Sequence, residues 1–295
     1  VLVVGAEVQT TVNAKIGADY LARAAHYRRQ RELDPFTFPC VFARRIKHVT
    51  EQTETSLDDL ARASVKAYAN ANLNPYAHMN AVKMTFENAA TPSDKNPLFL
   101  SNADYKPYLR VSDCSQVSDG GSAVVLCSQE GLDKIGRGRA EAIEVLSCAV
   151  STASLAADPD PLAMANTRHA AEQAYAAAGL TAADVKVAEI HDCFTVAEIL
   201  MYEALGFAEA GKGATLLREG QTEIDGKLPV NTGGGLVGFG HPVGATGVKQ
   251  AFEIYRQLRG QCGDYQVKGN PDVGLSANMG GDDRTSVVTL YRNAG

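Results

Sequence analysis

Apolar and polar positions along this chain form blocks that have either the short period of a strand or the longer period of a helix. Residues 1–6, VLVVGA, are a continuous apolar run, which is typical of a strand covered on both faces. Further strands are predicted over residues 119–127, 141–150, 185–190, 272–281 and 285–291, the last two joined by a tight turn. Because helical patterns separate most of these strands, the sequence predicts an α/β fold with a mixed sheet.

Three helices in the second half of the chain are indicated by apolar residues at helical spacing. An alanine-rich segment ends at Gly179, a residue suited to a helix C-cap. Thr195 and Glu198 have the spacing of a capping box, which predicts a helix that stops near Gly206. A further amphipathic helix is closed by Gly260.

Residues 11–110 differ from the rest because they are polar and aromatic and lack strand alternation. Ser56 and Asp59 predict a capping box at the start of a helix, and Asn74 with the following proline ends it. This part of the chain is expected to be an inserted, mostly helical subdomain.

A basic cluster lies within that segment. Residues 21–50 hold seven Lys and Arg against two acidic residues. The cluster fits a solvated surface, and it also fits a clamp for a phosphorylated ligand. The sequence leaves both interpretations open.

The bulk composition excludes several classes of protein. A net charge of -6 disfavours nucleic acid as the main partner. No run of 18 apolar residues is present, so we expect no membrane span. The six cysteines include no CxxC pair and no metal-ligand cluster accompanies them, which disfavours a zinc site and suggests a reducing compartment.

The run EIHDCF, residues 189–194, places ionisable side chains between a predicted strand and a predicted helix. Ligands of open α/β sheets bind at this edge. The positive helix end would lower the pKa of the Cys193 thiol, and His191 could donate to an oxygen that gains negative charge. A cysteine packed in the core and a histidine bonded to backbone are the alternative.

A second histidine lies in the glycine-rich run GGGLVGFGHPVGATG, residues 233–247. Phosphate-loop fingerprints fail, because Val243 stands where the dinucleotide motif needs glycine and Lys249 comes one residue too late for a P-loop. What remains is His241 in a rigid glycine frame, which could act as a general base toward a thiol or an α-carbon. A histidine satisfied within a turn is the alternative.

The run SANMGGDD, residues 276–283, contains the end of a predicted strand and the turn after it. The backbone N–H groups of Gly280 and Gly281 could form an oxyanion hole there. A plain hairpin turn is the alternative.

Together these runs resemble the C-terminal half of thiolases. In thiolases a strand–NEAF–helix element, a GHP-containing glycine loop and a C-x-G loop converge on one site. HDCF stands here where NEAF is expected, a substitution typical of the sterol carrier protein type of thiolase. DCSQVSDGGSAVVL, residues 113–126, also resembles the segment that returns from the thiolase loop domain.

This resemblance implies a thiolase-like layered fold with mixed sheets and a helical loop domain inserted in the N-terminal half. It divides the chain into a remainder of the N-terminal domain over 1–10 and 111–145, a loop domain over 11–110, and a C-terminal domain over 146–295.

The resemblance also implies roles for individual residues. His241 would activate a nucleophilic cysteine and contribute to the oxyanion hole for the thioester oxygen. His191 would replace the usual asparagine of that hole, and Cys193 would shuttle a proton to and from the α-carbon. Gly280 would supply an N–H to the second oxyanion hole. Ser115 would lie near the pantetheine arm of coenzyme A, whose phosphates the basic segment would face.

The implied activity is that of an acetyl-CoA C-acyltransferase, which cleaves 3-ketoacyl-CoA or runs the reverse condensation. Coenzyme A is a substrate in this reaction, and no other cofactor or metal is expected. The C-x-G cysteine is replaced by Asn278, which is expected if Cys193 takes over its role. The nucleophilic cysteine of thiolases would lie upstream of Val1, in an N-terminal portion that we expect to be missing, and Cys40 and Cys114 are poor substitutes for it.

Other functions stay open at this point. A non-catalytic thiolase-like protein that binds acyl-CoA is the main alternative. A ketosynthase would need a histidine in an NAHGT motif that the chain lacks, and the failed fingerprints disfavour a nucleotide-binding module. By resemblance we expect a homodimer in a peroxisome-type organelle or mitochondrion, although the chain carries no recognisable targeting signal.

Overall fold

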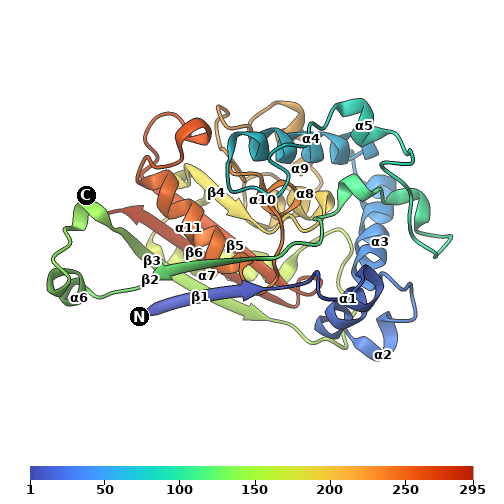
Figure 1. Ribbon diagram of the computed structural model, residues 1–295, viewed down its shortest axis with the longest axis horizontal. Helices are drawn as coiled ribbons and strands as arrows, with labels where there is room; N and C mark the ends of the chain where they lie inside the picture. The colour runs from blue at the N-terminus through green and yellow to red at the C-terminus, as the bar shows by residue number, and fades with distance from the viewer. Residues whose placement is uncertain (295) are drawn as a thin grey trace.

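The computed structural model describes residues 1–294 as two β-sheets with helices between and around them (Figure 1). One sheet pairs β1 with β2 in antiparallel fashion, and the other has the strand order β3-β6-β5-β4. In the larger sheet β4 and β5 run parallel and the other pairs antiparallel, so the predicted mixed α/β fold is confirmed. The strands are β1 Leu2–Glu7, β2 Gly120–Val125, β3 Ile143–Thr152, β4 Val187–Ile190, β5 Val273–Gly280 and β6 Thr285–Asn293.

Helices fill the long connections between these strands. The α-helices are α1 Ala14–Leu21, α2 Tyr27–Gln30, α3 Thr37–Gln52, α4 Leu57–Leu73, α5 Phe86–Ala90, α6 Gln129–Lys134, α7 Ala165–Ala178, α8 Thr195–Ala204, α9 Gly213–Arg218, α10 Gly235–Phe239 and α11 Thr246–Leu258. Short 3₁₀ turns cover Ala22–Ala24, Lys106–Tyr108, Val111–Asp113, Arg139–Glu141, Ala182–Asp184 and Gly263–Tyr265. Among the residues described, no helix is both long and apolar enough to cross a membrane.

Helix α11 lies between the two sheets and contacts β1 and β2 as well as β4 and β5 (Figure 1). The opposite face of the larger sheet is covered by α7. Strand β6 shows this division, because Leu290 belongs to the core cluster that includes α7, whereas its neighbour Tyr291 packs with Ile254 and Leu258 of α11. The molecule is therefore layered as sheet, helix, sheet, helix.

Five helices, α1 to α5, lie between β1 and β2 in the sequence and gather beside one end of the sheets (Figure 1). Helix α4 packs against α8, α9 and α10, so this segment is joined to the second half of the chain by direct contacts. The segment is mostly helical, as expected, and its boundaries as a separate domain stay a prediction.

The predicted helix caps at Ser56 and at Gly179 are confirmed. Ser56 accepts a hydrogen bond from the Asp59 backbone N–H, and the Asp59 carboxylate accepts one from the Ser56 backbone N–H. Gly179 adopts the left-handed conformation (φ 65°) that closes α7. The capping box at Thr195 is wrong, because Phe194 is the N-cap and the Glu198 carboxylate instead pairs with Lys66.

The prediction that the first strand is covered on both faces is also wrong. Five of the six residues of β1 are exposed or only partly buried, and Leu2 and Val4 are 66% and 64% exposed. Strand β1 pairs only with β2 among residues 1–294, and α11 covers one face of that pair. No described element covers the other face, so the apolar run identifies a strand but not its burial.

Candidate functional site

Five residues singled out from the sequence line one cavity of about 720 Å³: His191, Cys193, His241, Gly280 and Ser115. They come from four separate parts of the chain. His191 and Cys193 follow β4, His241 follows α10, Gly280 ends β5, and Ser115 precedes β2. The parallel pairing of β4 with β5 brings the first and third of these segments to the same edge of the sheet.

The imidazole rings of His191 and His241 face each other across this cavity. Their centroids are 5.0 Å apart, and the ring planes are nearly perpendicular at 89°. Burial lowers the pKa of His191 well below 6.5, and repulsion from the His241 ring, whenever that ring is protonated, lowers it further. Burial also lowers the pKa of His241 to about 4. Both rings are therefore neutral near pH 7, when each can donate from one nitrogen and accept at the other.

Thr246, at the start of α11, orients His241, and sequence reasoning missed it. The His241 Nδ1 lies 2.7 Å from the Thr246 hydroxyl oxygen, and that hydroxyl donates its own hydrogen to the Pro242 carbonyl. His241 must then donate from Nδ1, which leaves Nε2 as the unprotonated nitrogen. A hydroxyl residue five positions after the histidine, on the turn that enters a helix, was the available signal.

The environment of Cys193 differs from the expectation. The thiol is buried, and burial together with the nearby Asp192 and Asp282 carboxylates raises its pKa well above 9. The predicted lowering of its pKa by the helix N-terminus is therefore wrong, because loss of hydration outweighs the helix dipole. Cys193 stays a protonated thiol near pH 7, which suits a proton donor and not a standing thiolate.

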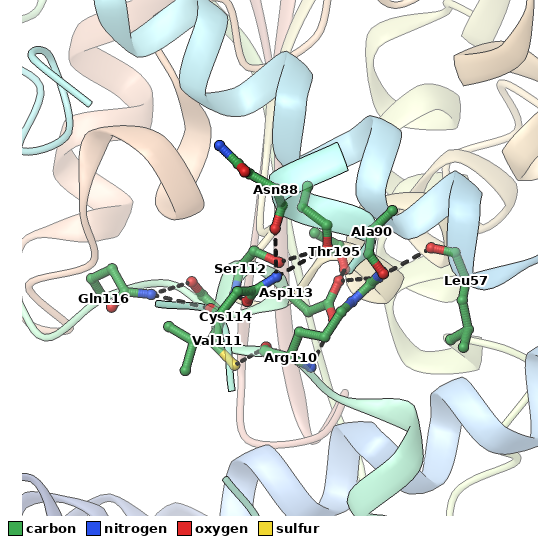
Figure 2. Close-up of polar contacts among 12 residues, drawn as sticks. Leu57, Asn88, Ala90, Arg110, Val111, Ser112, Asp113, Cys114, Gln116 and Thr195 are labelled. Atoms are coloured by element: carbon green, nitrogen blue, oxygen red, sulfur yellow. Dashed lines mark hydrogen bonds and ion pairs between the residues drawn. The ribbon is translucent and has the colours of Figure 1, made fainter. Parts of the chain in front are cut away.

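A buried polar network fixes the segment that carries Ser115 against the start of α8 (Figure 2). The Arg110 guanidinium makes two hydrogen bonds to the Asp113 carboxylate, at 2.8 and 2.9 Å, and Thr195 donates to the same carboxylate at 3.0 Å. The backbone N–H of Ser115 then donates to the Cys193 carbonyl at 2.9 Å. These bonds place Ser115 beside Cys193.

The glycines of the His241 loop have the conformations that the sequence suggested. Gly234, Gly235 and Gly240 all have positive φ, at 112°, 61° and 120°. A Cβ on Gly238 would be blocked by the Ala67 carbonyl of α4. The loop therefore packs tightly against its surroundings, as a rigid frame for a histidine requires.

Away from the polar groups the cavity is apolar. Its lining includes Phe36 and Phe38 at the start of α3 and Phe99, which meets Phe36 edge-to-face with centroids 5.3 Å apart. Phe42 also lines it and stacks on Phe194 of the HDCF run at 4.4 Å. These aromatic residues belong to the helical segment, and nothing in their spacing predicted the wall they form.

The basic cluster of residues 21–50 does not act as one patch. Arg45 is fully buried, where its guanidinium pairs with Asp282 at 2.6 Å and donates to three backbone carbonyls. Lys47 pairs with Glu51 on its own helix. Within residues 1–294 no Lys or Arg lines the cavity, so Arg45 is excluded from a phosphate clamp and the remaining cluster stays a prediction.

No cluster of three or more His, Cys, Asp or Glu suited to a metal ion occurs in the part of the chain that the structure describes.

Comparison with known proteins agrees with this geometry. The thiolase C-terminal domain-like family matches residues 147–293, which include His191, Cys193, His241 and Gly280 but not Ser115 or the aromatic wall. The chain is 31% identical to the acetyl-CoA acetyltransferase of Methanocaldococcus jannaschii, over 98% of this chain and 72% of that protein. The chain belongs to the thiolase family.

Several of its relatives are of the sterol carrier protein type, as the HDCF run predicted. The thiolase is 34% identical to sterol carrier protein 2 of Oryctolagus cuniculus, over 86% of this chain but only 45% of that protein. The solved structure of a monomeric SCP2-thiolase-like protein from Mycobacterium smegmatis covers the whole chain with a TM-score of 0.72 at 18% identity, which shows the same fold. This chain spans only part of the length of these relatives. It covers 63% of a second acetyl-CoA acetyltransferase, that of Methanothermobacter thermautotrophicus, to which it is 35% identical.

Proposed function

We propose that this thiolase takes part in acyl transfer between coenzyme A thioesters, cleaving or forming the bond between the α- and β-carbons of a 3-ketoacyl-CoA. The observation that carries the proposal is the pair of facing imidazoles on one cavity with the Cys193 thiol and Gly280. The acetyl-CoA acetyltransferase names of its relatives support the same reaction class.

The two neutral imidazoles supply the stabilisation that this chemistry needs. Bond cleavage leaves an enolate whose negative oxygen must be held by preorganised donors. His191, whose Nδ1 has no partner within the described protein, is available to turn toward such an oxygen. The free Nε2 of His241 can accept a proton from the nucleophilic thiol, and the resulting N–H can then donate a hydrogen bond to the thioester oxygen.

Cys193 supplies the proton for the carbon. A thiol whose pKa is raised keeps its proton until a stronger base, the enolate carbon, is formed beside it. The proton passes from sulfur to the α-carbon, and the thiolate is reprotonated when the coenzyme A thiol gives up its hydrogen. The reverse direction uses the same steps in the opposite order.

The nucleophile of the acyl-enzyme is proposed to come from sequence outside residues 1–295. Within the described residues, Cys114 and Cys193 are the cysteines that line the cavity. Burial raises the pKa of Cys114 well above 9, and its sulfur donates to the Arg110 carbonyl, so it is a poor nucleophile. The same observation favours a second candidate function, an acyl-CoA-binding protein without turnover.

The acyl group of the thioester is proposed to lie along the aromatic wall of Phe36, Phe38 and Phe99, which is apolar and continuous with the histidine pair. Coenzyme A is then the substrate and no resident cofactor is required. The homodimer and the organelle named above stay predictions.

Hydrogen–deuterium exchange tests the acid/base assignment on the chain as it is. We expect the protein to accelerate exchange of the α-protons of acetyl-CoA or decanoyl-CoA in D₂O, measured by NMR or mass spectrometry, and the acceleration to increase with pH because the base is the ionised form of the Cys193 thiol. Cys193→Ala should slow this exchange by about 10²-fold or more, since general acid–base groups contribute roughly 10²–10⁴. Cys127→Ala, at an exposed cysteine outside the cavity, is the matched control. Tight thioester binding with no exchange in any variant would favour the binding protein.

A further inference from the structure

Asp192 stands between the two site residues of the HDCF run, yet its side chain does not line the cavity. The residue is fully buried. Its carboxylate oxygen Oδ1 accepts the backbone N–H of Leu236 at 2.6 Å, so the side chain is directed toward the glycine loop and not toward substrate.

We propose that Asp192 is a positioning residue, whose carboxyl group clamps the glycine loop to the end of β4 and thereby sets the spacing of the His191 and His241 rings. Leu236 lies in the first turn of α10, and His241 follows that five-residue helix after Gly240. A hydrogen bond at Leu236 therefore fixes the N-terminal end of α10, and His241 follows the C-terminal end of this short helix.

The fit at Gly235 shows how close this clamp is. Gly235 has φ 61°, and a Cβ built on it would lie closer to the Asp192 Oδ2 than carbon and oxygen can approach. The loop backbone thus presses directly on the carboxyl group. Gly235 permits the contact for two reasons: it tolerates positive φ and it has no side chain.

Asp192 completes a series of bonds between the same two segments. Asn231 donates its backbone N–H to the Ala188 carbonyl at 2.9 Å, and its Oδ1 accepts the Ile190 N–H at 2.8 Å. Each bond joins β4 to the loop two residues further along the strand. The Asp192 bond is the last of the series and the one adjacent to His191.

Either charge state of Asp192 can serve this role. Burial and the Glu198 carboxylate of α8 raise the pKa of Asp192 to about 7, while the Leu236 N–H and the Lys249 ammonium of α11 lower it. Its second oxygen, Oδ2, has no hydrogen-bond partner in the described protein. Because a neutral carboxyl still accepts through Oδ1, the amide oxygen of asparagine should replace it.

Histidine NMR on the intact chain tests the clamp. In wild type we expect a cross-ring NOE between His191 and His241 and a His241 pKa near 4. Asp192→Ala should weaken the NOE at least threefold and raise the His241 pKa by a unit or more toward 6.5, as water enters. Asp192→Asn should restore both values. Glu203→Ala is the matched control, because Glu203 is a carboxylate that clamps the backbone of Gly211 and Gly213 outside this cavity.

Several outcomes would overturn the clamp. Unchanged ring signals in Asp192→Ala would do so, and so would an Asp192→Asn variant as disturbed as the alanine one, which would indicate a role for charge. If Asp192→Ala does not fold, Gly235→Ala becomes the decisive variant, since it pushes the same contact from the loop side and should move the His241 pKa in the same direction. The proposed function gives the ring spacing its catalytic meaning, but these readouts need no turnover. A failed exchange assay would therefore leave the clamp standing.

Discussion

The two sheets of this thiolase put similar apolar sequences into opposite surroundings. All four residues of β4 are buried, whereas in β1 only Gly5 is buried. Leu2 of β1 and its cross-strand partner Val125 of β2 are 66% and 65% exposed. The larger sheet has helices on both faces and carries the site at its edge, while the smaller sheet has α11 on one face. An apolar run in the sequence thus indicates that a strand forms, but its burial depends on which other elements pack against the faces of its sheet.

The largest effect is expected from breaking an ion pair in the covered region. Lys66 of α4 and Glu198 of α8 are each 1% exposed and pair with each other. Glu198→Ala should lower the free energy of unfolding by about 3–5 kcal/mol, because it leaves the Lys66 ammonium buried without a carboxylate. Urea unfolding gives the measurement.

Glu130→Ala is the control for that change. Glu130 pairs with Lys134 on α6, where both side chains are more than 70% exposed, so the loss should stay below about 1 kcal/mol. If Glu198→Ala and Glu130→Ala lowered the free energy of unfolding equally, the contrast between the covered and the exposed region would be contradicted.

Truncating one side chain in each sheet should reveal almost as large a difference in the loss of stability. Leu275 in β5 is fully buried, and Leu275→Ala should cost roughly 2–5 kcal/mol through lost contacts and a cavity. Val4→Ala in β1 removes a side chain that is 64% exposed and should cost well under about 1 kcal/mol. A Val4→Ala loss as large as that of Leu275→Ala would mean that β1 is covered in solution.

Acid should weaken the site region through His241. Its pKa falls from 6.5 in the unfolded chain to about 4 in the folded one, so the unfolded state binds the proton first as the pH drops through this window. Stability from the neutral ring is complete above pH 6.5 and is lost toward pH 4. When the pH falls from 7.5 to 5, the free energy of unfolding of His241→Gln should decrease by roughly 2 kcal/mol less than that of wild type. Urea unfolding at the two pH values gives the measurement.

The pKa values of Glu189 and Asp192 shift in the opposite direction to that of His241, because burial raises each to about 7. The folded state therefore binds their protons first on acidification, so these two groups add stability as the pH falls. They are present in both proteins, so their effect cancels in the comparison. Parallel pH profiles for wild type and His241→Gln would show that the ring is hydrated.

The smallest effect on stability is expected at the open face itself. Val4→Lys should change the free energy of unfolding by less than about 0.5 kcal/mol, since the side chain is exposed. It should reduce concentration-dependent association in analytical ultracentrifugation, because a charge interrupts the apolar stripe of Leu2, Val4 and Val125. Ile135→Lys, at a residue 60% exposed near α6, is the control and should leave association unchanged.

Local sequence signals predicted much of the framework and brought the site together. The strand positions, the Ser56 capping box and the glycine conformation at Gly179 depend on neighbouring residues, and all three are confirmed. His191, Cys193, His241 and Gly280 lie on one cavity, as the resemblance to thiolases implied.

What failed depends on distant contacts. The raised pKa of Cys193 comes mainly from burial, with smaller contributions from the adjacent Asp192 carboxylate and from the Asp282 carboxylate, which is 89 positions away in sequence. The capping box at Thr195 was lost because a lysine of α4 takes the Glu198 carboxylate. The wall of Phe36 and Phe99 joins two segments of the helical region that no periodicity connects. None of these features is visible within a window of a dozen residues.

The close packing of Gly5 against the His241 loop has a consequence for how such proteins can diverge. A Cβ on Gly5 would overlap the Gly244 carbonyl, and one on Gly244 would come within 2.6 Å of the Ala6 carbonyl. A substitution that adds a side chain at Gly5 or Gly244 therefore requires a compensating change in the other segment. A homologue with alanine at the position of Gly5 is expected to hold the loop, and with it the imidazole that corresponds to His241, in a different place.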